Sequence, residues 1–121
     1  MAIILVVEDD LLIRELIEMT LQGWGHDVVL ASDTEEALEV LRSNQPLDML
    51  FTDLSLKTAM NGGLDVAQQA LVLRATLGVL YATGNAMTRE MRARFVEGAD
   101  CLTKPYTDRQ LRNSIDRVLA A

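Results

Sequence analysis

Short apolar runs alternate with helical stripes of apolar residues along this chain, and this alternation limits the possible folds more than any other feature. Residues 3–7 read IILVV, a continuous aliphatic run typical of a parallel strand that is buried on both faces. Apolar residues then recur at helical spacing from Leu12 to Leu21, and Gly23 and Gly25 predict the end of that helix. The same patterns predict strands at 3–7, 28–31, 49–52, 78–82 and 101–103, and helices at 11–21, 32–41, 64–73, 88–98 and 107–119.

Strict alternation of strand and helix predicts a parallel sheet, because each crossover between parallel strands traverses the sheet and is almost always right-handed. The predicted fold is therefore α/β, a doubly wound parallel sheet of about five strands with helices on both faces. Ser32 and Glu35 form a capping-box pattern at the start of the second helix. Thr107 and Gln110 repeat that pattern at the last helix, and Thr88 predicts the start of the fourth.

The composition indicates size and compartment. The chain has 121 residues, 50% of them hydrophobic, which is enough for one core, and its one cysteine excludes an internal disulfide. The first apolar run lacks the preceding basic residues of a signal peptide and is too short to span a membrane. We therefore expect a single domain over residues 1–121, soluble and in a reducing compartment, with the cytoplasm as the default.

The net charge of -7 is unevenly distributed. Residues 1–61 carry 12 acidic and 3 basic residues, a balance of -9, whereas residues 62–121 carry 6 acidic and 8 basic residues, a balance of +2. The acid excess argues against nucleic acid as the main partner, because contacts to phosphates need a concentrated basic face. The acidic half instead predicts a bound cation.

Polar residues follow the predicted strands at the ends where the chain leaves the sheet. They are Glu8, Asp9 and Asp10 after the first strand, Thr52 and Asp53 after the third, Thr83, Gly84 and Asn85 after the fourth, and Thr103, Lys104 and Pro105 after the fifth. In an open α/β sheet, ligands bind beyond the carboxyl ends of the strands. Residues about fifty positions apart in the sequence should therefore converge on one crevice.

The residues expected in this crevice suit phosphoryl chemistry. Clustered carboxylates repel one another unless they are protonated or neutralised, and Mg²⁺ is the natural neutralising cation with oxygen ligands. Lys104 adds a compact positive charge for a phosphate oxygen, while Thr83 and the amide of Gly84 can hydrogen-bond two others. Asp53, placed beside the metal and the oxyanion site, can then attack phosphorus in line and become an aspartyl phosphate.

Four motifs, ILVVEDD, MLFTDLSL, YATGNA and LTKPY, resemble a response-regulator receiver domain, the phosphoacceptor module of two-component signalling. The resemblance covers nearly the whole chain and implies a flavodoxin-like sheet of strand order 2-1-3-4-5 and a cis peptide before Pro105. The implied site residues are Asp53 as the phosphoacceptor; Glu8, Asp9, Asp53 and the backbone carbonyl of Ser55 as Mg²⁺ ligands; Thr83 as the switch hydroxyl; and Lys104 as the phosphate-contacting amine.

The resemblance also implies partners. The phosphoryl donor is expected to be a phosphohistidine on a sensor histidine kinase or a phosphotransfer protein, and a downstream protein is expected to meet the face of the fourth helix, fifth strand and last helix. Arginines that give the second half its basic character either serve this face or are solvated helix surface; they are Arg89, Arg92, Arg94, Arg109, Arg112 and Arg117. No effector domain is expected, so the domain works by protein contact or belongs to a longer chain, and homodimerisation is left open.

Two departures from the family pattern alter these expectations. Leu56-Lys57 replaces the usual Met-Pro, and Gly62 comes late, so the loop from Thr58 to Gly63 is longer than usual and is expected to be mobile. Cys101 occupies the position where many receivers carry a Tyr or Phe. A small buried thiol cannot make the rotameric change of an aromatic ring, so signal transmission through that position is not expected.

Each site residue also has a structural explanation when it is taken alone. Asp53 could form a turn or a cap, Asp10 is expected to cap the first helix, and Thr83 and Lys104 could satisfy a backbone group or lie on the surface. Their joint placement favours the receiver.

Two other functions stay open: a pseudo-receiver that acts as a phosphorylation-independent interaction module, and a Mg²⁺ phosphohydrolase. The phosphohydrolase usually needs a second acid two residues after the nucleophile, where this chain has Ser55. Flavodoxin-like cofactor binding is excluded, because the acidic loop after the first strand would repel a flavin phosphate.

Overall fold

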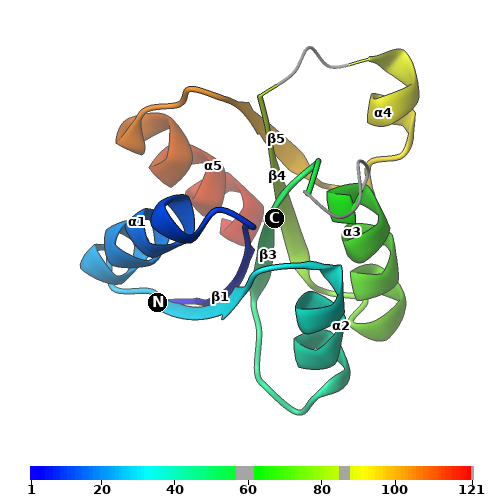
Figure 1. Ribbon diagram of the computed structural model, residues 1–121, viewed down its shortest axis with the longest axis horizontal. Coiled ribbons are helices and arrows are strands. Elements are labelled where there is room, and N and C mark those ends of the chain that lie inside the picture. The colour runs from blue at the N-terminus through cyan, green and yellow to red at the C-terminus, as the bar shows by residue number, and fades with distance from the viewer. Residues whose placement is uncertain (57–61, 85–87, 121) are drawn as a thin grey trace.

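Strands and helices alternate along the chain as the sequence predicts (Figure 1). The structure, a computed structural model, describes residues 1–56, 62–84 and 88–120. The strands are β1 (Ile3–Val7), β2 (Asp27–Ala31), β3 (Met49–Asp53), β4 (Gly78–Thr83) and β5 (Asp100–Thr103), and the helices are α1 (Leu11–Gly23), α2 (Thr34–Arg42), α3 (Gly62–Leu73), α4 (Arg89–Ala93) and α5 (Asp108–Ala120).

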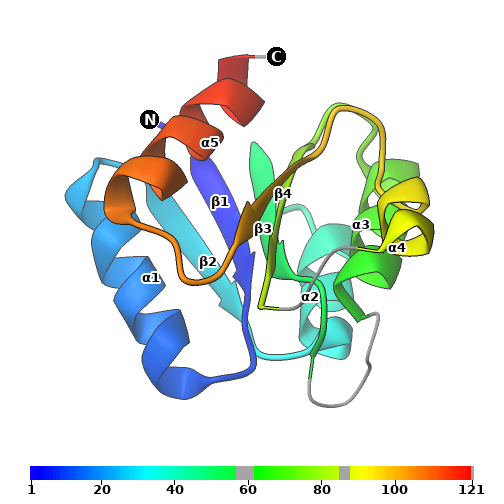
Figure 2. The ribbon, with the colours of Figure 1, turned by 90° about the horizontal axis from the view of Figure 1, so that it is seen from above.

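The strands form one parallel sheet in the order β2-β1-β3-β4-β5, which confirms the predicted fold and strand order. Figure 2 shows α1 and α5 on one face of the sheet and α2, α3 and α4 on the other. The strand order reverses between β1 and β3, so the crevice expected for a ligand lies beyond the carboxyl ends of these two strands. Within the described ranges, no helix is long and apolar enough to cross a membrane.

Each face of the sheet has its own core, because successive side chains of a strand point to opposite faces. Leu5 and Val7 of β1 pack in the cluster beneath α2 and α3, and Ile4 and Val6 pack in the cluster beneath α1 and α5. All four side chains are at most 1% exposed. The continuous apolar run of β1 therefore reflects burial on both faces, which places the acids that follow it on a rigid scaffold.

The cap of α2 lies one residue later than the sequence predicts. The N-cap is Asp33 rather than Ser32, and its carboxylate accepts a hydrogen bond from the Glu36 N–H at 2.8 Å. The carboxylate of Glu36, rather than that of Glu35, reaches back to the Ser32 N–H at 2.8 Å and to the Ser32 hydroxyl. The predicted Ser32–Glu35 box was wrong by one position because two good capping residues stand side by side.

The fourth helix is shorter than predicted. It begins after Thr88, whose hydroxyl accepts a backbone N–H of the first turn as expected, but it ends at Ala93 instead of continuing to Gly98. The next turn packs against the sheet: the Val96 N–H donates to the hydroxyl of buried Tyr81 at 3.3 Å. A tertiary hydrogen bond thus replaces a helical one and ends the helix.

Arg74, just beyond α3, joins that helix to the end of α2. Its guanidinium donates to the carbonyl oxygens of Val40 at 3.3 Å, Leu41 at 3.1 Å, Ser43 at 2.9 Å and Gln45 at 2.6 Å. The last carbonyl groups of an α-helix have no N–H donor within the helix. A single charged side chain therefore donates to the carbonyls of Leu41, Ser43 and Gln45 around the end of α2, and it adds a donor to the carbonyl of Val40, which Ser43 already contacts.

Replacing Arg74 with methionine should lower the free energy of unfolding by about 2 kcal/mol, because several part-buried carbonyls lose a charged donor. Arg74→Lys should recover only part of this loss, since an ammonium lacks the planar fork of a guanidinium. Urea denaturation measures both values. The control is Arg89→Met on the exposed surface of α4, which should change the free energy of unfolding by less than about 0.5 kcal/mol; equal losses at the two sites would contradict the assigned role.

Candidate functional site

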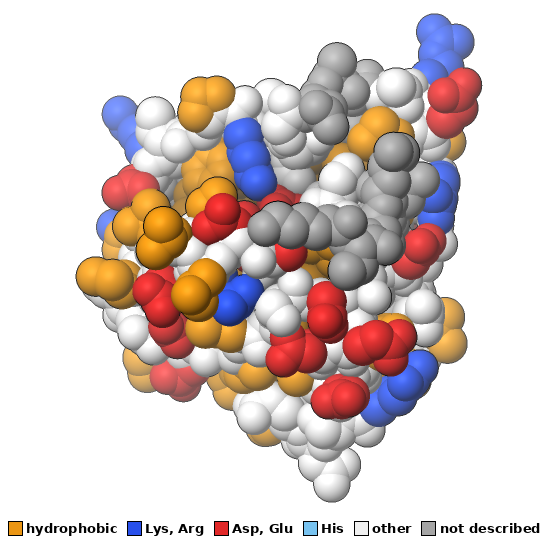
Figure 3. Space-filling view, viewed as in Figure 1, with side chains coloured by type: hydrophobic (Ala, Val, Ile, Leu, Met, Phe, Trp, Pro, Cys, Tyr) orange, Lys and Arg blue, Asp and Glu red, His pale blue; other side chains and the backbone are white. Residues whose placement is uncertain are grey.

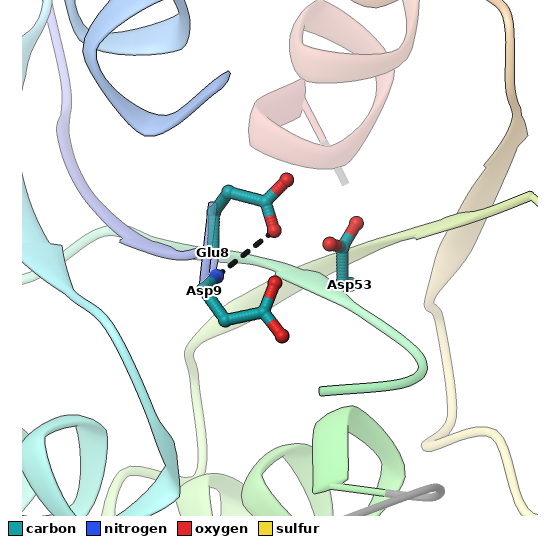
Figure 4. A group of neighbouring side chains, drawn as sticks. All are labelled: Glu8, Asp9 and Asp53. Atoms are coloured by element: carbon teal, nitrogen blue, oxygen red, sulfur yellow. Dashed lines mark hydrogen bonds between the residues drawn. The ribbon is translucent and has the colours of Figure 1, made fainter. Parts of the chain in front are cut away.

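The carboxyl ends of β1 and β3 bring three carboxylates together (Figure 4). Glu8 and Asp9 follow β1 and Asp53 ends β3, and one carboxylate oxygen from each lies within 4.8 Å of the other two. Glu8 is only 3% exposed, whereas Asp9 and Asp53 are partly exposed. Three carboxylates at this spacing form an all-oxygen donor set that fits a divalent cation such as Mg²⁺.

Lys104 enters the same cluster from the end of β5. Its Nζ lies 2.7 Å from Oδ1 of Asp53 and 3.9 Å from Oε1 of Glu8. Its backbone N–H donates to the carbonyl oxygen of Thr83 at 2.7 Å, and the Lys104–Pro105 peptide is cis, as the resemblance implied. The ammonium therefore points into the crevice and offsets the charge of the acids.

A small cavity of about 190 Å³ opens beside this ion pair. Its lining is formed by Asp53, Ser55, Ala82, Thr83, Gly84 and Lys104. The side chain of Thr83 is nearly buried, with 5% of the residue exposed. A carboxylate, a hydroxyl and an ammonium thus face one volume that suits a tetrahedral oxyanion. The structure places the residues that the resemblance assigned to the site in this cavity or in the acid cluster beside it; they are Glu8, Asp9, Asp53, Ser55, Thr83 and Lys104.

The backbone around Asp53 is held between β4 and the first turn of α3. The Leu54 N–H donates to the Ala82 carbonyl at 2.9 Å, and the Gly63 N–H donates to the Leu54 carbonyl at 3.0 Å. A Cβ atom at Gly63 would collide with the backbone carbonyl oxygen of Asp53. Sequence reasoning treated Gly63 only as the end of a loop, although the pair Gly62-Gly63 signals a close backbone approach.

Replacing Gly63 with alanine should therefore push α3 away from Asp53 and lower the free energy of unfolding by about 1–3 kcal/mol. The matched control is Gly23→Ala at the end of α1, where an added Cβ meets nothing within 4 Å. That variant should be neutral or slightly stabilising, because alanine is the better helix former. Thermal unfolding compares the two variants; a Gly63→Ala protein as stable as Gly23→Ala would show that the contact with Asp53 imposes no constraint.

Glu8 is the most perturbed carboxyl group of the cluster. Burial, and then the hydrogen bond and the charge of Asp53, raise the pKa of Glu8 to about 8, while the charge of Lys104 acts in the opposite direction. With no cation bound, Glu8 therefore holds a proton near neutral pH. A divalent cation would have to displace that proton before Glu8 could serve as a ligand.

The raised pKa of Glu8 predicts that the metal-free protein loses stability as the pH rises from about 4.5 to about 8. In this range the unfolded chain has released the proton and the folded chain still holds it, so folding becomes less favourable with each step in pH. Glu8→Gln should flatten this part of the profile. Denaturation at a series of pH values without divalent cations measures the effect, and parallel profiles for the two proteins would contradict it.

Cys101 lies beside an aromatic residue of the neighbouring strand. Burial raises the pKa of its thiol to about 11, although the residue is half-buried rather than fully buried. Tyr81 is its partner in the β4–β5 register, is fully buried, and stacks on Phe95 with ring centroids 4.4 Å apart. The aromatic side chain of this strand pair therefore stands on β4, two residues before Thr83, rather than on β5.

Some predictions fall on residues that the structure does not describe. They concern Lys57, most of the loop from Thr58 to Gly63, and Asn85, which lie wholly or largely outside the described ranges 1–56, 62–84 and 88–120.

Comparison with known proteins identifies relatives of the whole domain. A family model described as the response regulator receiver domain matches residues 4–116. The chain is 30% identical to the transcriptional regulatory protein ZraR of Escherichia coli over 97% of its own length and 26% of that protein. It is 36% identical to the response regulator MprA of Mycobacterium ulcerans over 89% of its own length and 46% of that protein. The chain thus spans less than half the length of these curated relatives.

The solved structures include a response regulator receiver protein from Sinorhizobium medicae. It matches this chain with a TM-score of 0.90 and 28% sequence identity, covering 99% of this chain and 95% of that one. The similarity therefore extends over the complete sheet and both layers of helices.

Proposed function

This chain belongs to the response regulator receiver domain family of two-component signalling, and we propose that Asp53 is its phosphoacceptor. One observation carries the proposal: the carboxylate of Asp53 lies within one cluster with the acids Glu8 and Asp9 and is also only 2.7 Å from the ammonium of Lys104. Positive charge beside this carboxylate, from a cation held by the acids and from the lysine, would allow an anionic phosphoryl group to approach it.

The proposed reaction is a transfer from phosphohistidine to Asp53. A carboxylate oxygen of Asp53 attacks the phosphorus atom, the P–O bond forms as the P–N bond breaks, and the electron pair of the broken bond stays on the imidazole nitrogen. The product is an acyl phosphate, and attack by water later releases inorganic phosphate and restores the carboxylate. Because the protein modifies its own side chain, it acts as a signalling phosphoacceptor rather than as an enzyme with a separate substrate.

Each group of the crevice has a part in this transfer. The ammonium of Lys104 would move from the Asp53 carboxylate to one phosphoryl oxygen. The hydroxyl of Thr83 would donate a hydrogen bond to a second phosphoryl oxygen. Glu8, Asp9 and Asp53, with the backbone carbonyl of Ser55, would hold Mg²⁺, which the oxygen donor set and the spacing of the carboxylates support. When bound, the ion would neutralise the negative charge that accumulates on the phosphoryl oxygens.

Incubation with acetyl phosphate and Mg²⁺, followed by intact mass measurement, tests the proposal. The wild-type protein should gain one phosphoryl group, and Asp53→Asn should gain none, because an amide is not a nucleophile toward phosphorus. Asp65→Asn is the control, since Asp65 is an exposed acid that pairs with Arg94 away from the crevice. Modification of the Asp53→Asn protein would overturn the assignment, and a wild-type protein that binds Mg²⁺ but gains no phosphate would favour the pseudo-receiver.

The donor is proposed to be a sensor histidine kinase or a phosphotransfer protein that covers α1. Figure 3 shows hydrophobic side chains gathered over α1, with acidic side chains among them. Leu11, Leu12, Leu16 and Met19 are each more than half exposed. A partner that brings its histidine to Asp53 has to cover the surface next to the crevice, so an apolar helical surface on the donor fits this patch.

The downstream partner is proposed to bind the face of α4, β5 and α5. Of the arginines predicted there, three are engaged within the domain: Arg94 with Asp65 at 2.6 Å, Arg117 with Asp100 at 2.7 Å, and Arg112 over the Trp24 ring at 5.5 Å. Among the described residues, the remaining three make no ion pair, namely Arg89, Arg92 and Arg109. Since α1 and α4 lie on opposite faces of the sheet (Figure 2), the donor patch and α4 would be covered from different sides.

A further inference from the structure

The peptide group that joins Glu8 to Asp9 is held at both of its polar atoms. Its carbonyl oxygen, that of Glu8, accepts a hydrogen bond from Nη1 of Arg14 at 2.8 Å. Its N–H, that of Asp9, donates to Oε2 of Glu8 at 3.0 Å. A peptide group is planar, so fixing both edges fixes its orientation and restricts the directions in which the two flanking side chains leave the backbone. These side chains are two of the three acids of the cluster.

Arg14 makes this contact from a rigid element. It lies in the first turns of α1, and the start of that helix is fixed by Asp10, whose carboxylate accepts the N–H groups of Leu12 and Ile13 at 2.9 and 3.1 Å. The predicted capping role of Asp10 is thereby confirmed. The guanidinium is partly buried and reaches back from the helix to the loop that precedes it.

The loop is also fixed from the side of β2. The Glu8 N–H donates to the Ala31 carbonyl at 3.1 Å, so both backbone polar atoms of Glu8 have partners. Hydrogen bonds from Ser32 lower the pKa of Glu36 in α2, and the positive charge of Arg14 adds to that effect. Arg14 therefore contacts the loop that follows β1, and its positive charge also acts on Glu36 in the first turn of α2.

We propose that Arg14 is a positioning residue of the metal site, which orients the Glu8–Asp9 peptide so that both carboxylates face one cation. The inference rests on the proposed function, because it requires a divalent cation at this acid cluster. It also predicts that removing a positive charge weakens Mg²⁺ binding. By charge alone, a guanidinium near the cluster opposes cation binding, so removing it would tighten binding, whereas removing a positioning contact would weaken it.

Calorimetric titration of each protein with Mg²⁺ separates these two effects. Arg14→Met should bind Mg²⁺ about tenfold more weakly than the wild type, despite the loss of a positive charge. Arg14→Lys keeps the charge and a donor, and it should lose much less affinity. Arg42→Met is the matched control, because it removes the same charge from the acidic half of the chain at the exposed last turn of α2 and should not weaken binding.

The rate of modification by acetyl phosphate at saturating Mg²⁺ provides a second measurement. It should fall in Arg14→Met and stay unchanged in Arg42→Met, because misplaced acids hold the ion in a less favourable position. If Arg14→Met does not fold, Arg14→Gln replaces it, since the shorter neutral side chain should weaken Mg²⁺ binding in the same way.

Unchanged or tighter Mg²⁺ binding by Arg14→Met, or by Arg14→Gln in its place, would overturn the positioning role. A wild-type protein that binds no Mg²⁺ would instead overturn the proposed function, and the inference would fall with it before any variant is compared. The two failures are therefore distinguishable.

Discussion

The ion pair between Lys104 and Asp53 is the interaction on which the rest of the site depends. Three carboxylates that lie within 4.8 Å of one another repel strongly, and the ammonium 2.7 Å from Asp53 offsets part of that repulsion. Lys104 can do so only because the carboxyl ends of the strands lie along one edge of the sheet, so that a side chain from the end of β5 reaches Asp53 at the end of β3 across β4. The strand order therefore determines whether the Lys104–Asp53 ion pair can form.

Three separate features limit the repulsion among the carboxylates or fix their positions when no cation is bound. Glu8 keeps its proton because burial raises its pKa, Lys104 neutralises Asp53, and Arg14 holds the backbone between Glu8 and Asp9. A divalent cation would replace the proton and leave the ammonium available for an incoming phosphoryl group. The site therefore allows a divalent cation to take the place of the Glu8 proton while the Lys104 ammonium turns to a phosphoryl group. The buried strands on both sides keep the positions of these groups rigid.

The sequence predicted the fold and the convergence of Glu8, Asp53 and Lys104 on one crevice because both follow from short-range patterns. Apolar runs and helical stripes identified the strands and helices, and polar residues at strand ends converge in any parallel sheet of this kind. Contacts that depend on the packing of particular backbone groups were missed. The close approach of Gly63 to the backbone of Asp53 depends on how α3 packs, and the bond from Arg14 goes to a backbone carbonyl, which leaves no signature in the sequence. Likewise, α4 ends early because of Tyr81 on another element.

The central claim is that the acids after β1 and Asp53 hold one cation beside Lys104. The most direct measurement is a titration with Mn²⁺, which accepts the same oxygen ligands, followed by the broadening of backbone amide signals in nuclear magnetic resonance spectra. The amides of Asp9, Leu54 and Lys104 should broaden first and together, while those of Gly25 and Gly98, away from the crevice, stay sharp. Broadening that spares Lys104, or that spreads evenly over the acidic surface of α2, would contradict a single shared site.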